Sequence, residues 1–252
     1  MELKHIKLYM KKIKEGILKI FQSLGYRLSR IEHAPITEQS NPYQDMQKLT
    51  GNNVNAVVFD IGANHGQSIE QFLSYFQEAN IYAFEPSENV FKALSNSLIG
   101  KKNKVKLYNF GLGSVLEKKL LNESEYSVMS SFLEVGSTGW GKILHTTMVD
   151  IKTVDQFCWE NNIHKIDILK SDTQGYDFEV LKGGINMLKK NVHIVYCELN
   201  FADMYINQGS FADICKLLVD NNFKLVKIYE VHIRNERWAW GDALFINLDF
   251  ME

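Results

Sequence analysis

The chain has 252 residues, of which 45% are hydrophobic, and this is enough for one large α/β domain with a short appendage. Its formal net charge of −2 supplies no basic excess to neutralise phosphates, so we exclude a general nucleic-acid-binding protein. Its three cysteines are widely spaced and show no metal or redox pattern, which indicates a reducing compartment and a cytoplasmic protein.

Residues 1–31 predict an amphipathic helix ahead of the main domain. Apolar residues recur there at alternating steps of three and four, as in a heptad seam, at Leu3, Ile6, Met10, Ile13, Ile17, Ile20 and Leu24. The other faces carry mostly lysine and arginine. Three interpretations stay open: packing on its own domain, self-association as a homodimer, and peripheral contact at the inner membrane surface. A Pro- and Gly-containing linker with one short helix should end near residue 53, and the main domain should cover residues 54–252.

The stretch 57–66 organises the main domain. Strand-favouring residues lead into Gly62 and Gly66, and an amphipathic run from Ser68 to Phe76 follows at once. Glycine tolerates positive φ and lets a ligand lie against bare backbone, while the N-terminus of the helix presents free N–H groups. A strand, a glycine turn and a helix in this order are typical of nucleotide binding in open α/β sheets.

The next strand strengthens this interpretation. Glu85 and Pro86 directly follow the predicted strand 81–84, about one βαβ unit after the glycine turn. A carboxylate at this strand tip is placed to accept hydrogen bonds from both ribose hydroxyls. The spacing D-x-G-x-x-x-G, which begins at Asp60, differs from the dinucleotide fingerprint G-x-G-x-x-G. Together these features predict a nucleotide-type cofactor.

Strands and helices alternate through the rest of the chain, which predicts a doubly wound, mostly parallel seven-stranded sheet whose last strand is antiparallel. The expected strands are 57–61, 81–84, 105–109, 166–170, 193–197, 223–229 and 243–247, and the expected helices are 66–77, 89–98, 178–189 and 211–220. The alternation stops over residues 114–164. We expect an insertion there, with a short helix over 151–160, that is either a surface hairpin or a substrate-facing cover containing Ser130 and Ser131.

Polar residues follow the other strands at the edge where a ligand would bind. Asn109 and the backbone at Leu112 follow the third strand and are placed to contact an adenine edge. Asp172 and Gln174 follow the fourth strand, beside the reactive end of a bound cofactor. Asp172 is therefore our first candidate for a catalytic role.

Two residues after the fifth strand, Glu198 and Asn200, could complete a hard-cation site with Asp172. We do not favour Mg²⁺ there, because oxygen-bearing residues are common at strand tips. Among the histidines only His65, in the glycine turn, is placed near the chemistry, and a histidine that simply hydrogen-bonds is the simpler interpretation.

Together these motifs resemble the FkbM family of S-adenosylmethionine-dependent methyltransferases, which have the class I Rossmann-like fold. The resemblance runs in order over residues 55–200 and is carried by segments 59–66, 83–86, 109–113, 129–131, 153–157, 170–177, 179–184 and 197–198. After the fourth strand the family usually has Lys-Ile-Asp-x-Glu-Gly-x-Glu. Here Gln174 and Asp177 replace the two glutamates, which weakens any mechanism that needs a carboxylate at Gln174.

The resemblance implies that S-adenosylmethionine is the cofactor and that the partner is a small molecule or glycan whose hydroxyl is methylated. The expected cofactor contacts are Asp60, Gly62, Ala63, Asn64, Gly66, Ser68, Glu85, Pro86, Asn109, Leu112 and Asp172. The expected acceptor contacts are Ser130, Ser131, Gln174, Tyr176 and Glu198. Asp172 and His65 are the candidates for catalysis, as a base or by orienting the acceptor.

Two other functions stay open at this point. A nicotinamide-dependent oxidoreductase would explain Glu85 but not the missing G-x-G-x-x-G spacing. A non-catalytic subunit of glycan assembly could keep the fold without turnover, and the departure at Gln174 is its only support.

Overall fold

The computed structural model describes residues 41–99 and 104–251, so the predicted N-terminal heptad seam lies outside the described residues. The first described element is α2 (Pro42–Leu49), and the side chain of Asn41 caps it by accepting from the amide of Tyr43 at 2.9 Å. Met46 is fully buried, and the Tyr43 ring lies 5.1 Å from that of Phe72. These contacts make α2 part of the compact unit that begins at Asn41.

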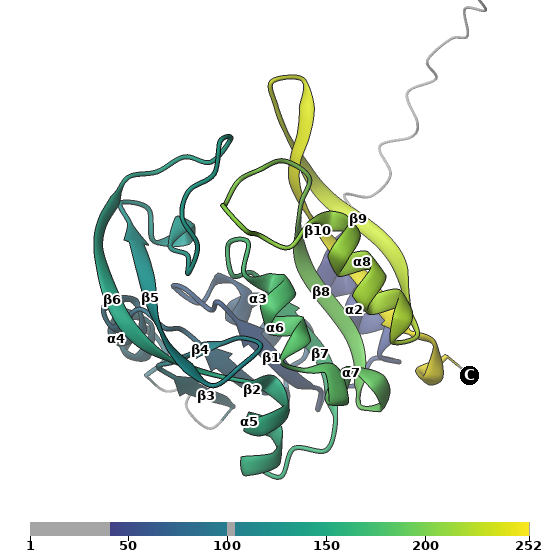
Figure 1. Cartoon of the computed structure of the whole chain (residues 1–252). Helices are drawn as coiled ribbons and strands as arrows, with labels where there is room; N and C mark the ends of the chain where they lie inside the picture. Colours follow the sequence, from purple (N-terminus) through teal and green to yellow (C-terminus); the bar gives the residue numbers. More distant parts are fainter. Residues whose placement is uncertain (1–40, 100–103, 252) are drawn as a thin grey trace, which may run out of the picture. The chain divides into compact units, whose positions relative to one another are not determined.

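Seven strands form the main sheet in the order β3-β2-β1-β7-β8-β10-β9 (Figure 1). Their bounds are β1 (Val57–Ile61), β2 (Asn80–Phe84), β3 (Val105–Tyr108), β7 (Ile166–Ser171), β8 (Val192–Asn200), β9 (Phe223–Arg234) and β10 (Arg237–Asn247). Strand β10 runs antiparallel to β8 and β9, and the pairs from β3 to β8 are parallel. The predicted doubly wound sheet with an antiparallel last strand is confirmed.

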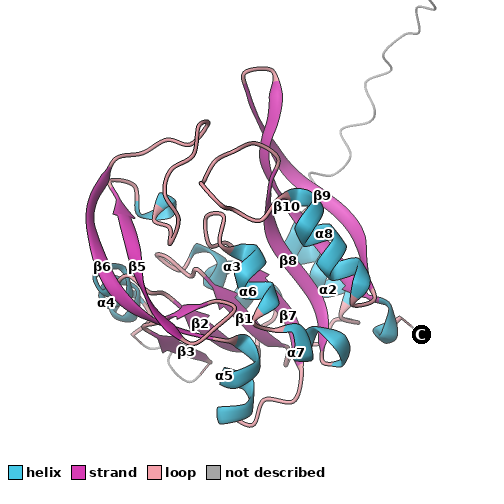
Figure 2. Ribbon diagram, viewed as in Figure 1, coloured by secondary structure: helices cyan, strands magenta, loops and turns pink. Residues whose placement is uncertain are grey.

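Helices cover both faces of this sheet (Figure 2), because alternate residues of the central strands are apolar on both sides. One core contains Val58 with side chains of α2, α3 (Gln67–Tyr75) and α4 (Glu88–Ser97). The other contains Phe59 with side chains of α5 (Val154–Glu160), α6 (Asp177–Lys182), α7 (Ile185–Lys190) and α8 (Phe211–Asp220). Within the described residues no helix has the length and apolar character needed to cross a bilayer.

The single helix predicted over 178–189 is wrong, because the chain forms α6 and α7 with a break at Gly183 and Gly184. A Cβ on Gly183 would overlap the carbonyl oxygen of Gly113. The break thus lets the backbone pass close to the start of the insertion, a tertiary contact that helical periodicity cannot reveal.

The insertion builds a second sheet, in the order β4-β6-β5, from β4 (Gly111–Leu112), β5 (Glu117–Ser124) and β6 (Ile143–Lys152). Leu121 of β5 is buried in the same core as Phe59, so this sheet is part of the domain. A hydrogen bond of 2.7 Å from Ser87 Oγ to Glu123 Oε2 ties it to the residues after β2. The short helix η1 (Ser127–Met129) follows β5 and brings the insertion over the ends of the parallel strands.

The last two strands form a longer hairpin than the sequence predicted. The expected strands 223–229 and 243–247 are its core-side ends, and β9 and β10 continue beyond them to the turn at Asn235 and Glu236. This end of the hairpin projects from the main sheet (Figure 1). The short helix η2 (Leu248–Phe250) follows β10.

Candidate active site

A cavity of about 340 Å³ lies at the carboxyl ends of β1, β2 and β7, a volume that suits a small-molecule site. Its walls come from the turns after these strands, from the insertion, from β8 and β10, and from α2. The predicted site residues that line it are Gly62, Ala63, Asn64, Ser68, Glu85, Pro86, Leu112, Ser130, Ser131, Asp172 and Gln174. Lining residues that the motifs did not predict include Tyr43, Phe110, Ser127, Lys170, Tyr196 and Asp242.

The turn after β1 is shaped by residues with a left-handed backbone. Gly62, Asn64 and Gly66 have φ angles of +79°, +46° and +90°. The amide of Gly62 donates to the carbonyl oxygen of Phe84 at 3.0 Å, which ties the turn to the end of β2. A Cβ on Gly62 would overlap the carbonyl oxygen of Asp172. Glycine is therefore required here both by conformation and by the close approach of two strand ends.

Substituting Gly62 with alanine is expected to destabilise the protein by more than the ~1–2 kcal/mol that a left-handed backbone costs an L-residue. The extra loss comes from the overlap with the Asp172 carbonyl group. Gly51 provides the matched control, because its φ is +64° and an added Cβ would have no atom within 4 Å. Gly51→Ala should show the backbone cost alone. Urea unfolding measures both variants, and equal losses would contradict the packing argument.

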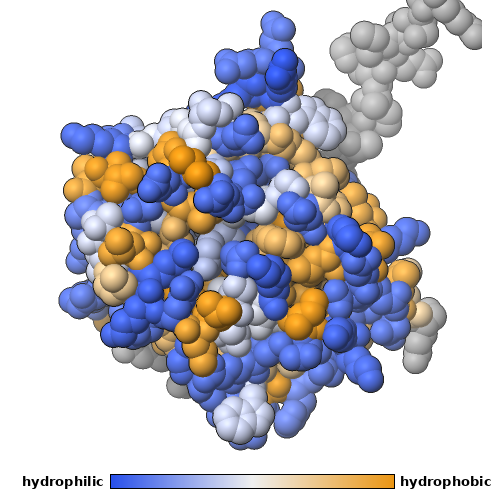
Figure 3. Space-filling view, viewed as in Figure 1, coloured by the Kyte–Doolittle hydropathy of each residue, from blue (hydrophilic) through white to orange (hydrophobic). Residues whose placement is uncertain are grey.

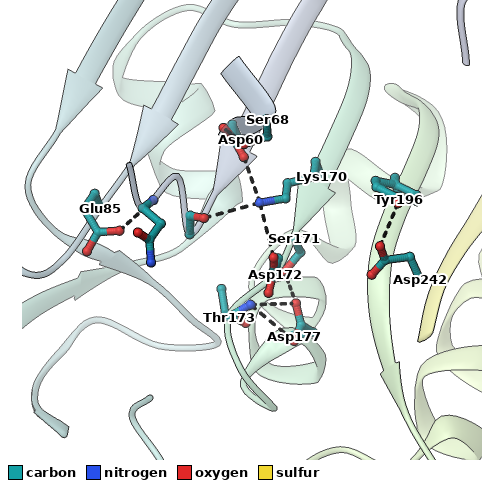
Figure 4. Close-up of polar contacts among 12 residues, drawn as sticks. Asp60, Ser68, Glu85, Lys170, Ser171, Asp172, Thr173, Asp177, Tyr196 and Asp242 are labelled. Carbon is teal, nitrogen blue, oxygen red and sulfur yellow. Dashed lines mark hydrogen bonds and ion pairs between the residues drawn. The ribbon is translucent and has the colours of Figure 1, made fainter. Parts of the chain in front are cut away.

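Glu85, at the end of β2, faces the turn after β1 (Figure 4) and is 7% exposed. Its carboxylate accepts from the amides of Asn64 at 2.9 Å and Ser87 at 2.8 Å. Burial raises the pKa of the Glu85 carboxyl to about 7, and the two hydrogen bonds oppose this shift. A carboxylate has about four lone-pair sites, so Glu85 keeps capacity for hydroxyl donors in the cavity.

Asn109 supports this strand end from outside the cavity. Its amide nitrogen donates to the carbonyl oxygens of Glu85 at 2.9 Å and Pro86 at 3.1 Å. The side chain that was predicted to contact adenine is therefore engaged by the turn that carries Glu85. Phe110, the next residue along, lines the cavity instead.

Lys170 lies at the centre of the buried charges (Figure 4). Its ammonium group is 3.0 Å from Asp60 Oδ1 and 3.7 Å from Asp172 Oδ2, and it donates to the carbonyl oxygen of Gly62 at 3.3 Å. Burial alone would lower the pKa of Lys170, but the two carboxylates outweigh burial and the pKa is raised. Asp60 also accepts from Ser68 Oγ at 2.5 Å and is fully buried, so it supports the turn through Lys170 and Ser68.

The turn after β7 presents Asp172 to the cavity. Its side chain is 43% exposed, and its Oδ1 accepts from the amide nitrogen of Gln174 at 2.8 Å. Behind the turn, buried Asp177 accepts from Ser171 Oγ at 2.5 Å and from the amide of Thr173 at 3.2 Å. Burial raises the pKa of Asp177 to about 6. Asp177 thus fixes the turn through these buried hydrogen bonds, while the Asp172 carboxylate faces the cavity.

Asp242 lines the cavity from β10, opposite the turn after β7 (Figure 4). Tyr196 donates its hydroxyl to Asp242 Oδ2 at 2.8 Å. Burial, and then the charge of Asp172, raise the pKa of Asp242 to about 6. Besides Glu85, the cavity lining therefore contains a carboxyl group, that of Asp242, that can take up a proton near neutral pH.

The predicted acceptor contacts fall in different places. Ser130 and Ser131 line the cavity, and Ser131 Oγ donates to the carbonyl oxygen of Gln174 at 2.7 Å, which joins the insertion to the turn after β7. Tyr176 lies outside the cavity lining, where its buried ring packs 5.1 Å from the ring of Phe132. Tyr176 therefore supports the insertion by packing against Phe132.

His65 and Glu198 also lie outside the cavity lining. His65 is exposed, and its Nε2 is 3.2 Å from the hydroxyl of Ser127, which donates to Asn64 Oδ1 at 3.1 Å. Glu198 is buried and accepts from the Asn200 amide nitrogen at 3.2 Å. Burial, followed by the charges of nearby aspartates, raises the pKa of Glu198 well above its usual value. Across residues 41–99 and 104–251, no three His, Cys, Asp or Glu side chains are grouped to hold a metal ion.

A family model described as the methyltransferase FkbM domain matches residues 60–225. The chain belongs to the FkbM methyltransferase family. It is an S-adenosylmethionine-dependent methyltransferase, as the resemblance to this family implied, and not a nicotinamide-dependent oxidoreductase. The match contains the glycine turn, Glu85, Lys170 and Asp172, and it ends before β10, which carries Asp242.

Two relatives of this FkbM protein have named activities. The chain is 24% identical over 202 residues to the 2-O-methyltransferase NoeI of Sinorhizobium fredii. The matched region covers 76% of this chain and 79% of NoeI. It is 27% identical over 165 residues to the hexuronic acid methyltransferase AglP of Haloferax volcanii. This matched region covers 64% of this chain and 61% of AglP.

The fold of this FkbM protein is similar to the crystal structure of methyltransferase FkbM from Methylobacillus flagellatus KT. The TM-score is 0.52 and the sequence identity 14%, over 83% of this chain. The similar region covers 48% of that protein, so the chain spans about half its length. The similarity shows a shared fold.

Proposed function

We propose that this chain transfers the methyl group of S-adenosylmethionine to a hydroxyl group of a sugar in the cavity at the ends of β1, β2 and β7. The observation that carries the proposal is that the glycine turn, Glu85 and Asp172 all line this one cavity. The name of NoeI, a 2-O-methyltransferase, supports an oxygen acceptor, and the name of AglP, a hexuronic acid methyltransferase, supports a sugar as the acceptor.

The cofactor fits the cavity by the chemistry of its lining. Glu85 offers carboxylate oxygens to the ribose hydroxyls, in charge-assisted hydrogen bonds. Phe110 and Leu112 provide apolar surface for the adenine ring. The bare backbone at Gly62 lets the amino-acid part of the cofactor lie close to the ends of β1 and β7.

S-adenosylmethionine supplies an electrophilic methyl group on its sulfonium sulfur. The chain has to hold the acceptor hydroxyl in line with that methyl group and to receive the hydroxyl proton. Orientation of two bound reactants is worth ~7–11 kcal/mol, whereas a general base contributes about 10²–10⁴-fold. Asp172, exposed to the cavity and oriented by Gln174, is the proposed acceptor-side group. Asp242 faces it and is the second carboxyl able to take the proton.

The affinity for S-adenosylmethionine should depend on pH through Glu85. Ribose hydroxyls donate to the ionised carboxylate, and burial holds the pKa of this carboxyl at about 7 in the free protein. Affinity should therefore rise with pH by up to about tenfold per unit below pH 7 and level off above it. Isothermal titration calorimetry from pH 5.5 to 8.5 measures this, and titration with NAD should show no binding.

Glu85→Gln removes the charge and should weaken cofactor binding by about 10–100-fold while flattening the pH profile. Glu88→Gln is the matched control, since Glu88 is an exposed glutamate in the next helix and should change neither quantity. An unaltered affinity in Glu85→Gln would reject the placement of the ribose. Transfer of a labelled methyl group from S-adenosylmethionine to a sugar then tests the reaction itself.

A further inference from the structure

The end of the β9–β10 hairpin meets the insertion through one arginine. The guanidinium carbon of Arg234 lies 5.1 Å from the ring centroid of Trp140 and 5.6 Å from that of Trp240. Its Nη1 donates to the carbonyl oxygen of Thr138 at 3.3 Å. On the hairpin, His232 stacks on Trp240 with ring centroids 4.4 Å apart. Arg234 is thus held between two indole rings, a favourable cation–π geometry.

This aromatic cluster is connected to the cavity through neighbouring residues on β10 and on the insertion. Trp240 is two residues before Asp242 on β10, so the two side chains project from the same face of the strand and their Cα atoms are about 7 Å apart. Trp140 lies 5.7 Å from the ring of Tyr126, and the next residues, Ser127 and Val128, line the cavity. Trp140 is 37% exposed and Tyr126 is 52% exposed. Aromatic surface therefore continues from the cavity rim toward the hairpin.

The charges near the cavity differ between its interior and this rim. Inside, Asp172 and Asp242 face the open space, and Lys170 is already paired with two carboxylates. At the rim, Arg234 forms no ion pair with any described carboxylate. A guanidinium has five N–H donors, so donors remain for a ligand beyond the one given to Thr138. In the space-filling view the projecting hairpin end is hydrophilic (Figure 3), which suits a polar ligand better than an apolar partner.

We propose that Arg234 and the indole rings of Trp140 and Trp240 form a subsite for an anionic group on the sugar acceptor. This proposal rests on the proposed function. Exposed aromatic faces pack on the apolar faces of sugar rings, and a guanidinium fork matches the oxygens of a carboxylate or phosphate. The acidic interior repels such a group, so it would point outward to Arg234 while the hydroxyl to be methylated enters the cavity. The acceptor class is a glycan with a uronate or a sugar phosphate beside the methylated unit.

The test compares three disaccharides that differ only in their anionic group: cellobiose, cellobiouronic acid and cellobiose 1-phosphate. Dissociation constants are measured by saturation-transfer NMR on the full chain with S-adenosylmethionine bound. At least one anionic sugar should bind about tenfold more tightly than cellobiose. The arm that shows the preference distinguishes a carboxylate from a phosphate.

Arg234→Gln should remove this preference and leave the affinities for cellobiose and for S-adenosylmethionine unchanged. Arg237→Gln is the matched control, because Arg237 lies on the same hairpin and is exposed, and its loss should leave the preference intact. The inference is overturned by equal binding of all three sugars to the wild-type chain. It is also overturned if the preference for the anionic sugar persists in Arg234→Gln, or if that variant binds cellobiose more weakly by the same factor as it binds the anionic sugar. These outcomes leave cofactor binding untouched, whereas failure to bind S-adenosylmethionine would reject the proposed function itself.

Discussion

Replacing Lys170 with methionine is expected to lower the free energy of unfolding by about 3–5 kcal/mol. Lys170 is buried, and its partner Asp60 is fully buried at 3.0 Å, so the substitution leaves a carboxylate without its counter-charge. The Asp172 carboxylate and the carbonyl oxygen of Gly62 lose the same partner. We therefore expect weaker binding of S-adenosylmethionine as well, because the turn after β1 loses one of its supports. Urea denaturation and calorimetry measure the two effects.

Lys182 offers a matched control for this substitution. It pairs with Glu179 at 2.9 Å, nearly the same distance, but the Lys182 side chain is 43% exposed. An exposed pair is worth ~0–1 kcal/mol, so Lys182→Met should scarcely change stability. If the two variants lost similar amounts, burial of the Asp60–Lys170 pair would not be what stabilises the strand ends.

The parts of the site that sequence predicted are those carried by short, local patterns. The glycine turn is recognisable because Gly62 and Gly66 follow a strand directly and must adopt positive φ. Glu85 is recognisable because it ends the next parallel strand, and parallel strands end at the same edge of the sheet. Both residue positions follow from the βαβ arrangement alone, so no tertiary contact had to be known.

Other site residues depend on contacts between distant segments. Asp242 enters the cavity only because β10 runs antiparallel between β8 and β9, which brings it opposite Glu198 in the strand register. Tyr43 reaches the cavity because α2 packs on α3, although the residues around it suggested a linker. Lys170 belongs to the motif at the end of the fourth predicted strand. A lysine at this position, two residues before Asp172, is a sequence signal for a buried ion pair, which the structure forms with Asp60.

Asp172→Asn is expected to lower kcat by about 10²–10⁴-fold while changing the affinity for S-adenosylmethionine little. Asparagine has nearly the same shape and can still accept from Gln174 through its side-chain oxygen, but it cannot take a proton from the acceptor hydroxyl. The proposed role predicts a loss in turnover, because the carboxylate acts on the acceptor side. Steady-state methyl transfer gives kcat, and calorimetry gives the cofactor affinity of the same protein.

Asp242→Asn decides which of the two proposed bases, Asp172 or Asp242, receives the proton. The Tyr196 hydroxyl can still donate to an asparagine oxygen at this position, so the wall of the cavity should be preserved. If Asp172 receives the proton, Asp242→Asn should retain most of the turnover. A larger loss in Asp242→Asn than in Asp172→Asn would transfer the role of base to β10. A loss of cofactor affinity in Asp172→Asn would instead place that carboxylate on the cofactor side of the cavity.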